Sequence, residues 1–364
     1  MKRLPIETLH SFMIEVFTHI GVPAEDAGIC ADILIASDLR GIESHGIGRL
    51  KMYYDRIKAG IQKPVTQIEV IRDKHATAVW DGNHGMGHVI GFRAMSEAIR
   101  KASQYGLGAV AVRNSTHYGI CGYYADMACR QNMLGLTFTN ARPSICPTHG
   151  VEPLLGTNPI CFGAPTDLPY PFIYDAATSI TQRGKIEQYA REEKDTPPAW
   201  AIDLEGKPQT DTPKLLVDLV KRTASLLPIG GTDELTGSHK GYGLSTMVEI
   251  LCSALQQGAF LNQLLGKDAS GKAAPYKLGH FFLAINIDFF TEIDDFKRTT
   301  GSICRELQNS RRFPGQDRIW VAGEKEYEKE QEVRKLGVPI IPNLQKDIEF
   351  MAKDLGLDIS SLGL

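Results

Sequence analysis

The sequence predicts an α/β fold with a separate helical domain that is assembled from both ends of the chain. In the middle of the chain, short apolar runs rich in Val, Leu, Ile and Phe alternate with helical patterns, which is typical of an α/β core. The first and last thirds of the chain read as mainly helical. We therefore expect a helical domain from residues 1–75 and 305–364 around an α/β cofactor and substrate domain at residues 76–304.

The expected elements follow in order along the chain. Apolar side chains at helical spacing predict helices at Leu9–Ile20, Ala27–Leu34, Phe92–Ala102 and Leu244–Leu255. Tyr123–Asn132 and Phe296–Leu307 also read as helices, Glu324–Lys335 reads as a charged, solvated helix, and a further element begins near Ser44. Short apolar runs predict strands at Ile68–Ile71, Thr77–Trp80, Leu107–Val112, Leu134–Thr139, Ile160–Gly163, Phe172–Asp175 and Phe281–Asp288. Residues 140–200 are dense in Pro, Gly, Asn and Thr, a composition that favours loops and often accompanies function.

Charge and composition exclude several classes of protein. The 364 residues include 40 Lys and Arg against 43 Asp and Glu, a net charge of −3, so neither a nucleic acid nor a membrane surface is an expected partner. No apolar run reaches the roughly 18 residues of a membrane span, and the N-terminus lacks a secretory pattern. The seven cysteines form no C-x-x-C pair, which predicts reduced, mostly buried thiols in a cytoplasmic protein.

A conventional Rossmann site is not supported by the sequence. The glycine-rich stretch from Gly82 to Gly91 follows a predicted strand and opens a helix, but its spacing misses G-x-G-x-x-G. No acidic residue follows at the distance that the dinucleotide fingerprint requires, and no P-loop motif is present. His84 and His88 in this stretch are four residues apart and offer a metal-dependent hydrolase as an alternative, although a third ligand is missing and no metal site is expected.

Two short segments carry candidate catalytic side chains. His45 and Arg49 are four residues apart, so on a helix they would share one face. An arginine can hold a carboxylate by two parallel hydrogen bonds, and a histidine can exchange a proton at neutral pH. His117 follows the predicted strand at Leu107–Val112, a common place for an exposed reactive side chain. Each segment alone is also compatible with an ordinary surface pair or a turn histidine.

Three polar turns are candidate anion sites. They are Leu155–Pro159, Asp175–Ser179 and Ser238–Gly243, where small hydroxyls, backbone N–H groups and Lys240 could meet phosphate oxygens. Lys240 stands near the start of a helix, where a positive charge opposes the helix dipole, so a functional reason for it is favoured.

Five motifs together resemble the malate/L-lactate dehydrogenase family that is unrelated to the Rossmann-fold dehydrogenases. In family order, they are SHGIGRL at 44–50, STHYGICGYYADMA at 115–128, EPLLGTNPICFGAPT at 152–166, YDAATS at 174–179 and HKGYGLSTMVEIL at 239–251. The resemblance implies a non-Rossmann, mixed-sheet nucleotide-binding domain and a discontinuous helical domain. It also implies a cytoplasmic homodimer that uses NAD or NADP to transfer a hydride to or from an L-2-hydroxy or 2-oxo acid.

The resemblance also implies roles for individual residues. His45 and His117 are the acid/base candidates, ranked level, and Arg49 is the carboxylate clamp. The substrate would be bound by Ser44 and Arg49, with Thr157 and Asn158 as further candidates. Arg142, which many family members lack, is a substrate candidate specific to this chain. The cofactor would be bound by Asn140, Asp175, Ala177, Thr178, Ser179, Thr181, His239, Lys240, Gly323 and Glu324. Residues 184–240 depart from the commonest family pattern, and the segment Lys185–Lys194 is unusually charged.

Arg142 bears on the choice of substrate. It stands in Asn140–Ser144, where family members vary, and a second arginine could pair with the second carboxylate that malate has and lactate lacks. An arginine facing solvent or a cofactor phosphate is an equal alternative. Malate and oxaloacetate are thus the favoured pair, with lactate, ureidoglycolate, sulfolactate or diketogulonate chemistry as alternatives. A non-catalytic metabolite-binding protein on the same scaffold is the competing class.

Overall fold

The computed structural model describes residues 2–363 and has the predicted mixed α/β architecture. Its α-helices are α1 (Ile6–His19), α2 (Ala24–Leu39), α3 (Leu50–Lys58), α4 (Gly87–Tyr105), α5 (Cys121–Cys129), α6 (Arg183–Arg191), α7 (Thr212–Lys221), α8 (Ser238–Leu251), α9 (Ile293–Asn309), α10 (Glu324–Leu336) and α11 (Pro342–Leu355). Its strands are β1 (Lys2–Leu4), β2 (Glu69–Lys74), β3 (Thr77–Asp81), β4 (Leu107–Ser115), β5 (Met133–Thr139), β6 (Ile160–Ala164), β7 (Phe172–Ala176), β8 (Ala201–Asp203), β9 (Ala224–Leu226), β10 (Leu278–Asn286) and β11 (Val338–Ile340).

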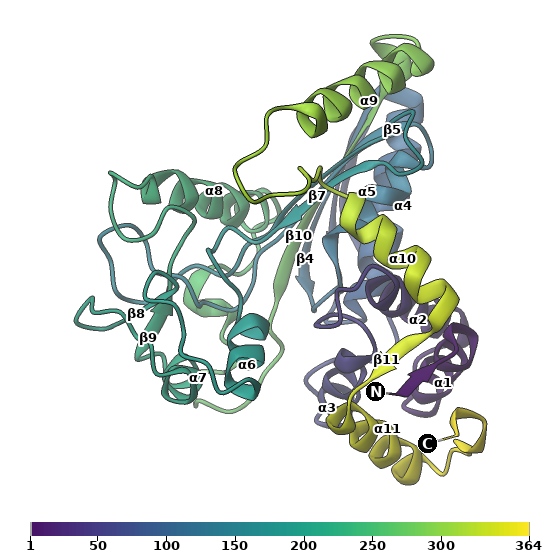
Figure 1. Cartoon of the computed structure of the whole chain (residues 1–364). Coiled ribbons are helices and arrows are strands. Elements are labelled where there is room, and N and C mark those ends of the chain that lie inside the picture. Colours follow the sequence, from purple (N-terminus) through teal and green to yellow (C-terminus); the bar gives the residue numbers. More distant parts are fainter. Residues whose placement is uncertain (1, 364) are drawn as a thin grey trace.

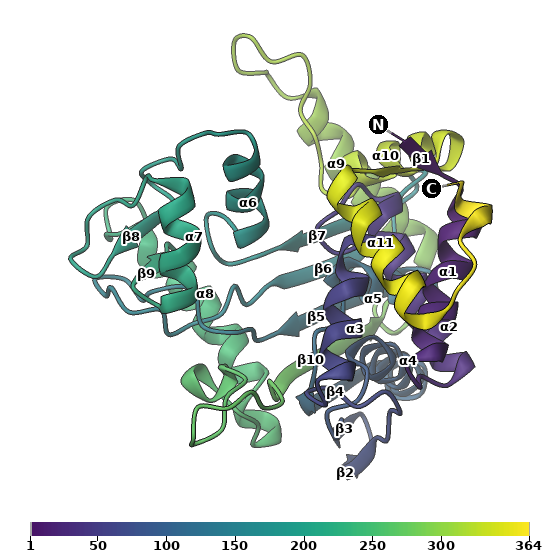
Figure 2. The same cartoon turned by 90° about the horizontal axis from the view of Figure 1, so that it is seen from below.

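A seven-stranded sheet in the order β2-β3-β4-β10-β5-β6-β7 occupies the middle of the molecule (Figure 2). Strands β3 and β4 run parallel, whereas the other neighbours are antiparallel. Strand β10 arrives from late in the chain and lies between β4 and β5, where Phe282 stands opposite Val110 and Thr137. Helix α4 packs on β4 and β10, and α5 packs on β5 and β6, so the sheet's core forms between these strands and helices.

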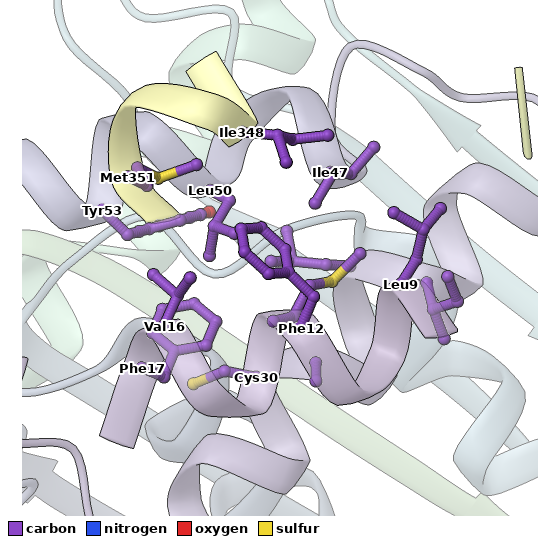
Figure 3. Close-up of a cluster of buried hydrophobic side chains, with 14 of the residues drawn as sticks. Leu9, Phe12, Val16, Phe17, Cys30, Ile47, Leu50, Tyr53, Ile348 and Met351 are labelled. Atoms are coloured by element: carbon purple, nitrogen blue, oxygen red, sulfur yellow. The ribbon is translucent and has the colours of Figure 1, made fainter. Parts of the chain in front are cut away.

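Both ends of the chain build a helical unit beside the sheet (Figure 1). Strand β1 pairs with β11, with Leu4 opposite Val338. In the core of this unit, side chains of α1, α2 and α3 meet Ile348 and Met351 of α11 (Figure 3). The discontinuous helical domain of the predicted fold class is therefore confirmed, because one apolar core needs residues from both termini.

The structure also contains elements that the sequence pattern did not reveal. Helices α6 and α7 and the two-stranded sheet β8-β9 surround a small core at Ile145, Leu215 and Leu226, beyond one end of the large sheet (Figure 2). Strands β1 and β11 are three residues long, too short to show a period. Helix α8 begins at Ser238, six residues before its apolar pattern, and its Leu244 and Met247 side chains are exposed.

The structure bears on two expectations drawn from composition, namely the state of the cysteines and the presence of membrane-spanning helices. All seven cysteines are buried and unpaired, as predicted. Among the described residues, no helix combines the length and apolarity needed to cross a membrane.

Candidate active site

A cavity of about 170 Å³ brings the two candidate acid/base residues together. The rings of His45 and His117 face each other with centroids 5.4 Å apart and planes inclined by 24°. Four more of the sequence-predicted site residues line the same cavity, namely Asn140, Thr157, Asp175 and Ala177. Residues separated by more than 100 positions therefore meet where β4, β5 and β7 end.

The loop that carries His45 and Arg49 is not helical at His45, contrary to our expectation. His45 lies in a turn, and a single 3-10 turn (Ile47–Arg49) leads into α3. Gly46 is required here because an added Cβ would lie 1.8 Å from Oδ1 of Asp38 on α2. Ser44 Oγ lies 2.9 Å from His45 Nδ1, and Arg49 Nε donates a 2.5 Å hydrogen bond to the Ser44 carbonyl oxygen. Local contacts thus bring the pair together without a shared helix face.

His117 is positioned by the glycine-rich stretch from Gly82 to Gly91, whose spacing did not support a dinucleotide-binding turn. The backbone N–H of Gly87 donates to Thr116 Oγ1 at 2.9 Å, and Thr116 Oγ1 donates to the Gly85 carbonyl oxygen. A Cβ on Gly87 would come within 2.4 Å of the Thr116 and His117 carbonyl oxygens. Gly87 is therefore needed for close packing of the start of α4 against the His117 segment.

A tyrosine contacts one of the two histidines. The hydroxyl of Tyr53 on α3 lies 2.5 Å from Nδ1 of His117, and the Gly119 N–H donates to the same nitrogen at 3.4 Å. Tyr53 is not among the site residues predicted from the sequence, although its position four residues after Arg49 is a usable signal. Asp38, which holds the His45 loop, and Gln182, which lines the cavity, were also not predicted.

Without a bound substrate, burial favours the neutral form of both histidines. It lowers the pKa of His45 to about 4, and the nearby Arg49 charge adds to this effect. The pKa of His117 falls well below its usual value for the same reason, with further contributions from His45 and Arg49. A bound carboxylate would oppose both effects, because a negative charge favours the protonated imidazole. The arrangement is suited to a small organic anion.

A second cavity of about 350 Å³ adjoins the first and shares Ile42, Ile120 and Asp175 with it. Gly323 lines the second cavity, and Asp175 Oδ2 accepts a 2.7 Å hydrogen bond from the Gly122 N–H. Desolvation by the surrounding residues raises the pKa of the Asp175 carboxyl group. Asp175 thus stands where the two cavities meet, and Gly323 lines the second cavity, which alone has the volume of a typical small-molecule site.

The remaining predicted residues fall into two groups. The first group is buried and internally bonded: Asn158, Thr178, Ser179, Thr181 and Glu324. Asn158, for example, donates to the Ser245 carbonyl and Glu249 and accepts from the Ala141 N–H, so it shapes the cavity wall. The second group, His239, Lys240 and Arg142, is exposed and does not line either cavity.

Comparison with known proteins identifies close relatives. The family model described as malate/L-lactate dehydrogenase matches residues 4–349. The malate dehydrogenase of Pyrococcus abyssi is 44% identical over 355 residues, covering 98% of this chain and 95% of the relative. The L-sulfolactate dehydrogenase of Methanocaldococcus jannaschii is 38% identical, covering 97% of each chain. The crystal structure of malate dehydrogenase from Entamoeba histolytica matches with a TM-score of 0.95 at 44% identity, covering 98% of this chain and 99% of that one.

Proposed function

The chain belongs to the malate/L-lactate dehydrogenase family, and from this premise we propose that it transfers a hydride between a nicotinamide cofactor and an L-2-hydroxy or 2-oxo acid. Malate and oxaloacetate are the favoured pair, since two relatives at 44% identity carry the name malate dehydrogenase. The observation that carries the proposal is the pair of facing histidines, His45 and His117, in one cavity. Arg49 is held next to this pair by its hydrogen bond to the carbonyl oxygen of Ser44, the residue before His45.

The residues present fit a nicotinamide cofactor. Asn140, Asp175 and Ala177 line the histidine cavity, and Asp175 and Gly323 line the larger adjoining one, so they would hold the cofactor next to the acid/base pair. When bound, the cofactor supplies or accepts the hydride. The choice between NAD and NADP, the homodimer and the cytoplasmic location stay predictions from the family resemblance.

The protein's own residues bind the acid and move the proton. Arg49 uses its Nε to hold the Ser44 carbonyl oxygen, and its terminal amino groups have no described partner. These groups would clamp the C1 carboxylate of the substrate. His45 or His117 would protonate the C2 oxygen as the hydride reaches C2, and the same group would take the proton back in the oxidation direction.

Absorbance at 340 nm with NADH and NADPH against a panel of 2-oxo acids tests the proposal. We expect oxidation of at least one cofactor with oxaloacetate, and His45→Ala and His117→Ala should each lower the rate by about 10²–10⁴-fold. His19→Ala, on the exposed side of α1, is the matched control and should keep full activity. No turnover with any pair would overturn the proposal, and oxaloacetate binding without turnover would favour a metabolite-binding protein.

A further inference from the structure

Tyr53 connects the helical core to the active site. Its ring is buried among the side chains of α1, α2 and α11 in the helical unit (Figure 3). The ring packs against His88 with centroids 4.6 Å apart, and its hydroxyl reaches Nδ1 of His117. Because the ring is enclosed on all sides by packed side chains, the hydroxyl is held in place more firmly than that of a surface tyrosine.

The contacts of His117 determine where its ring proton lies. A backbone N–H can only donate, so the contact from Gly119 requires Nδ1 to be an acceptor. Burial raises the pKa of Tyr53, so its hydroxyl keeps its proton and can donate to the same nitrogen. In a neutral imidazole, an accepting Nδ1 leaves the proton on Nε2. No hydrogen bond to Nε2 occurs within the described residues, and the ring lines the cavity.

His45 is anchored differently. Its Nδ1 contacts only the hydroxyl of Ser44 among the described groups. A serine hydroxyl can rotate and either donate or accept, so it suits both the neutral and the charged imidazole. Two fixed donors do not suit a charged His117, since Nδ1 would then carry a proton facing the Gly119 N–H.

The basic groups around His117 act in the same direction. Those that affect its titration are His45, Arg49, Arg56 and His88, all of them bases, besides the neutral Tyr53 that faces Nδ1. A second proton on His117 would add positive charge next to Arg49 and Arg56. The neutral form is therefore favoured by the surrounding charges as well as by the hydrogen bonds.

Building on the proposed function, we propose that Tyr53 is a positioning residue that, with the Gly119 N–H, holds His117 as the neutral tautomer protonated on Nε2. His117 then donates a hydrogen bond to the 2-oxo group of the substrate without giving up its proton, and His45 transfers the proton. In the reduction, the hydride forms the new C2–H bond, the C=O π electrons move to oxygen, and that oxygen takes a proton from the His45 imidazolium. A bound reduced nicotinamide would supply this hydride with its electron pair, and His45 is left neutral.

Nitrogen-15 NMR of labelled histidine rings, without substrate, tests the tautomer. The His117 signals, identified by their loss in His117→Gln, should show a proton on Nε2 throughout pH 6–8 in the wild type. Tyr53→Phe removes one donor and should shift His117 towards the other tautomer or the charged form. The matched control Tyr54→Phe, whose hydroxyl donates to Asp354 instead, should leave the signals unchanged. An Nδ1-protonated His117 in the wild type, or no change in Tyr53→Phe, overturns the proposal.

Kinetics separate the two histidine roles. Glutamine can donate a hydrogen bond but cannot transfer a proton at neutral pH, so His117→Gln should retain at least tenfold more kcat than His117→Ala. His45→Gln should be as slow as His45→Ala. Tyr53→Phe should lower kcat about tenfold with little change in KM. The reverse order, with glutamine tolerated at 45 and not at 117, overturns the assignment. If no variant or wild type turns over, the dehydrogenase proposal fails, while the NMR result still decides the tautomer.

Discussion

Oδ2 of Asp38 accepts a 2.8 Å hydrogen bond from the backbone N–H of Ile47 and thereby fixes the loop that carries His45 and Arg49. Asp38 lies on α2, within the helical unit, and is almost fully buried. Burial raises its pKa to about 8, although the hydrogen bond from Ile47 acts in the opposite direction. The helical unit therefore does more than cover the sheet, because one of its buried carboxyl groups shapes the active-site loop.

Gly46→Ala tests this contact. The new methyl group would fall 1.8 Å from Asp38 Oδ1, so either the loop or Asp38 must move. We expect a higher KM for the 2-oxo acid, a lower kcat, and a loss of about 1–3 kcal/mol in the free energy of unfolding measured with urea. Gly243→Ala on α8 is the control, because nothing lies within 4 Å of its added Cβ and alanine favours a helix. Unchanged kinetics and stability in Gly46→Ala would contradict the prediction.

Arg49→Lys should weaken substrate binding while leaving the charge in place. A lysine cannot reproduce the flat, multidentate contact with both the Ser44 carbonyl oxygen and a carboxylate. A lost charge-assisted hydrogen bond of about 1.5–3 kcal/mol corresponds to a KM roughly 10–100-fold higher. Steady-state kinetics with oxaloacetate measure this. Arg56→Lys, whose guanidinium stacks 4.5 Å from the Tyr276 ring centre, is the comparison and should affect KM far less.

The two buried histidines His88 and His280 should respond differently to replacement by leucine. His280 is hydrogen-bonded through both ring nitrogens, to Thr139 Oγ1 and Ser115 Oγ. Because His280→Leu leaves both hydroxyls without these partners, it should lower the free energy of unfolding at pH 7 by about 1–3 kcal/mol. Neither ring nitrogen of His88 has a partner among the described residues. His88→Leu should therefore leave the free energy of unfolding at pH 7 unchanged or higher. Urea unfolding of both variants checks the contrast, and equal losses would refute it.

The buried His88 also predicts how the free energy of unfolding depends on pH. Burial lowers the pKa of His88 from 6.5 to about 3, so below pH 6.5 the unfolded chain binds a proton that the folded chain excludes. The free energy of unfolding therefore falls as the pH drops from about 6.5 towards 3, by up to about 1.4 kcal/mol per pH unit from this group. His88→Leu removes this contribution, so its unfolding free energy should fall less steeply than that of the wild type between pH 6.5 and 5. Parallel curves for the two proteins would contradict the assignment.

Arg142→Ala tests substrate choice. Arg142 is exposed beside Ala141, whose backbone lines the histidine cavity. If Arg142 meets a second carboxylate, its removal should lower kcat/KM for oxaloacetate about tenfold or more while pyruvate reduction is unaffected. Arg72→Ala, on the edge strand β2, is the control and should change neither activity. An equal loss with both substrates would indicate a role that does not involve the second carboxylate.

Much of the central fold could be predicted because its signals are local. The strands β3 to β7 and helices α1, α4 and α5 show their apolar periods within a few residues. Helices α6 and α7 were missed for different reasons. Helix α6 is rich in charged residues and buries only Ile186, so it shows no apolar period. Helix α7 has Leu215, Leu216 and Leu219 at helical spacing, a usable signal that the prediction overlooked. At the site, His45, Arg49 and His117 were found from chemistry and motif, but the expected shared helix was wrong because Asp38, on another element, bends the loop.

By itself, the sequence determined the α/β class, the absence of a Rossmann fingerprint and the residue types for acid/base and carboxylate chemistry, because composition and short motifs carry this information. The tertiary structure alone decided that β10 lies between β4 and β5, that Gly87 packs against the His117 segment, and that Tyr53 reaches His117. The residues that these contacts join are separated in the sequence by 29 positions at the least and by more than 140 at the most. The apolar periodicity of a short segment does not show which distant segment it will contact. Such pairings form because they bury apolar faces and provide hydrogen-bond partners for buried polar groups.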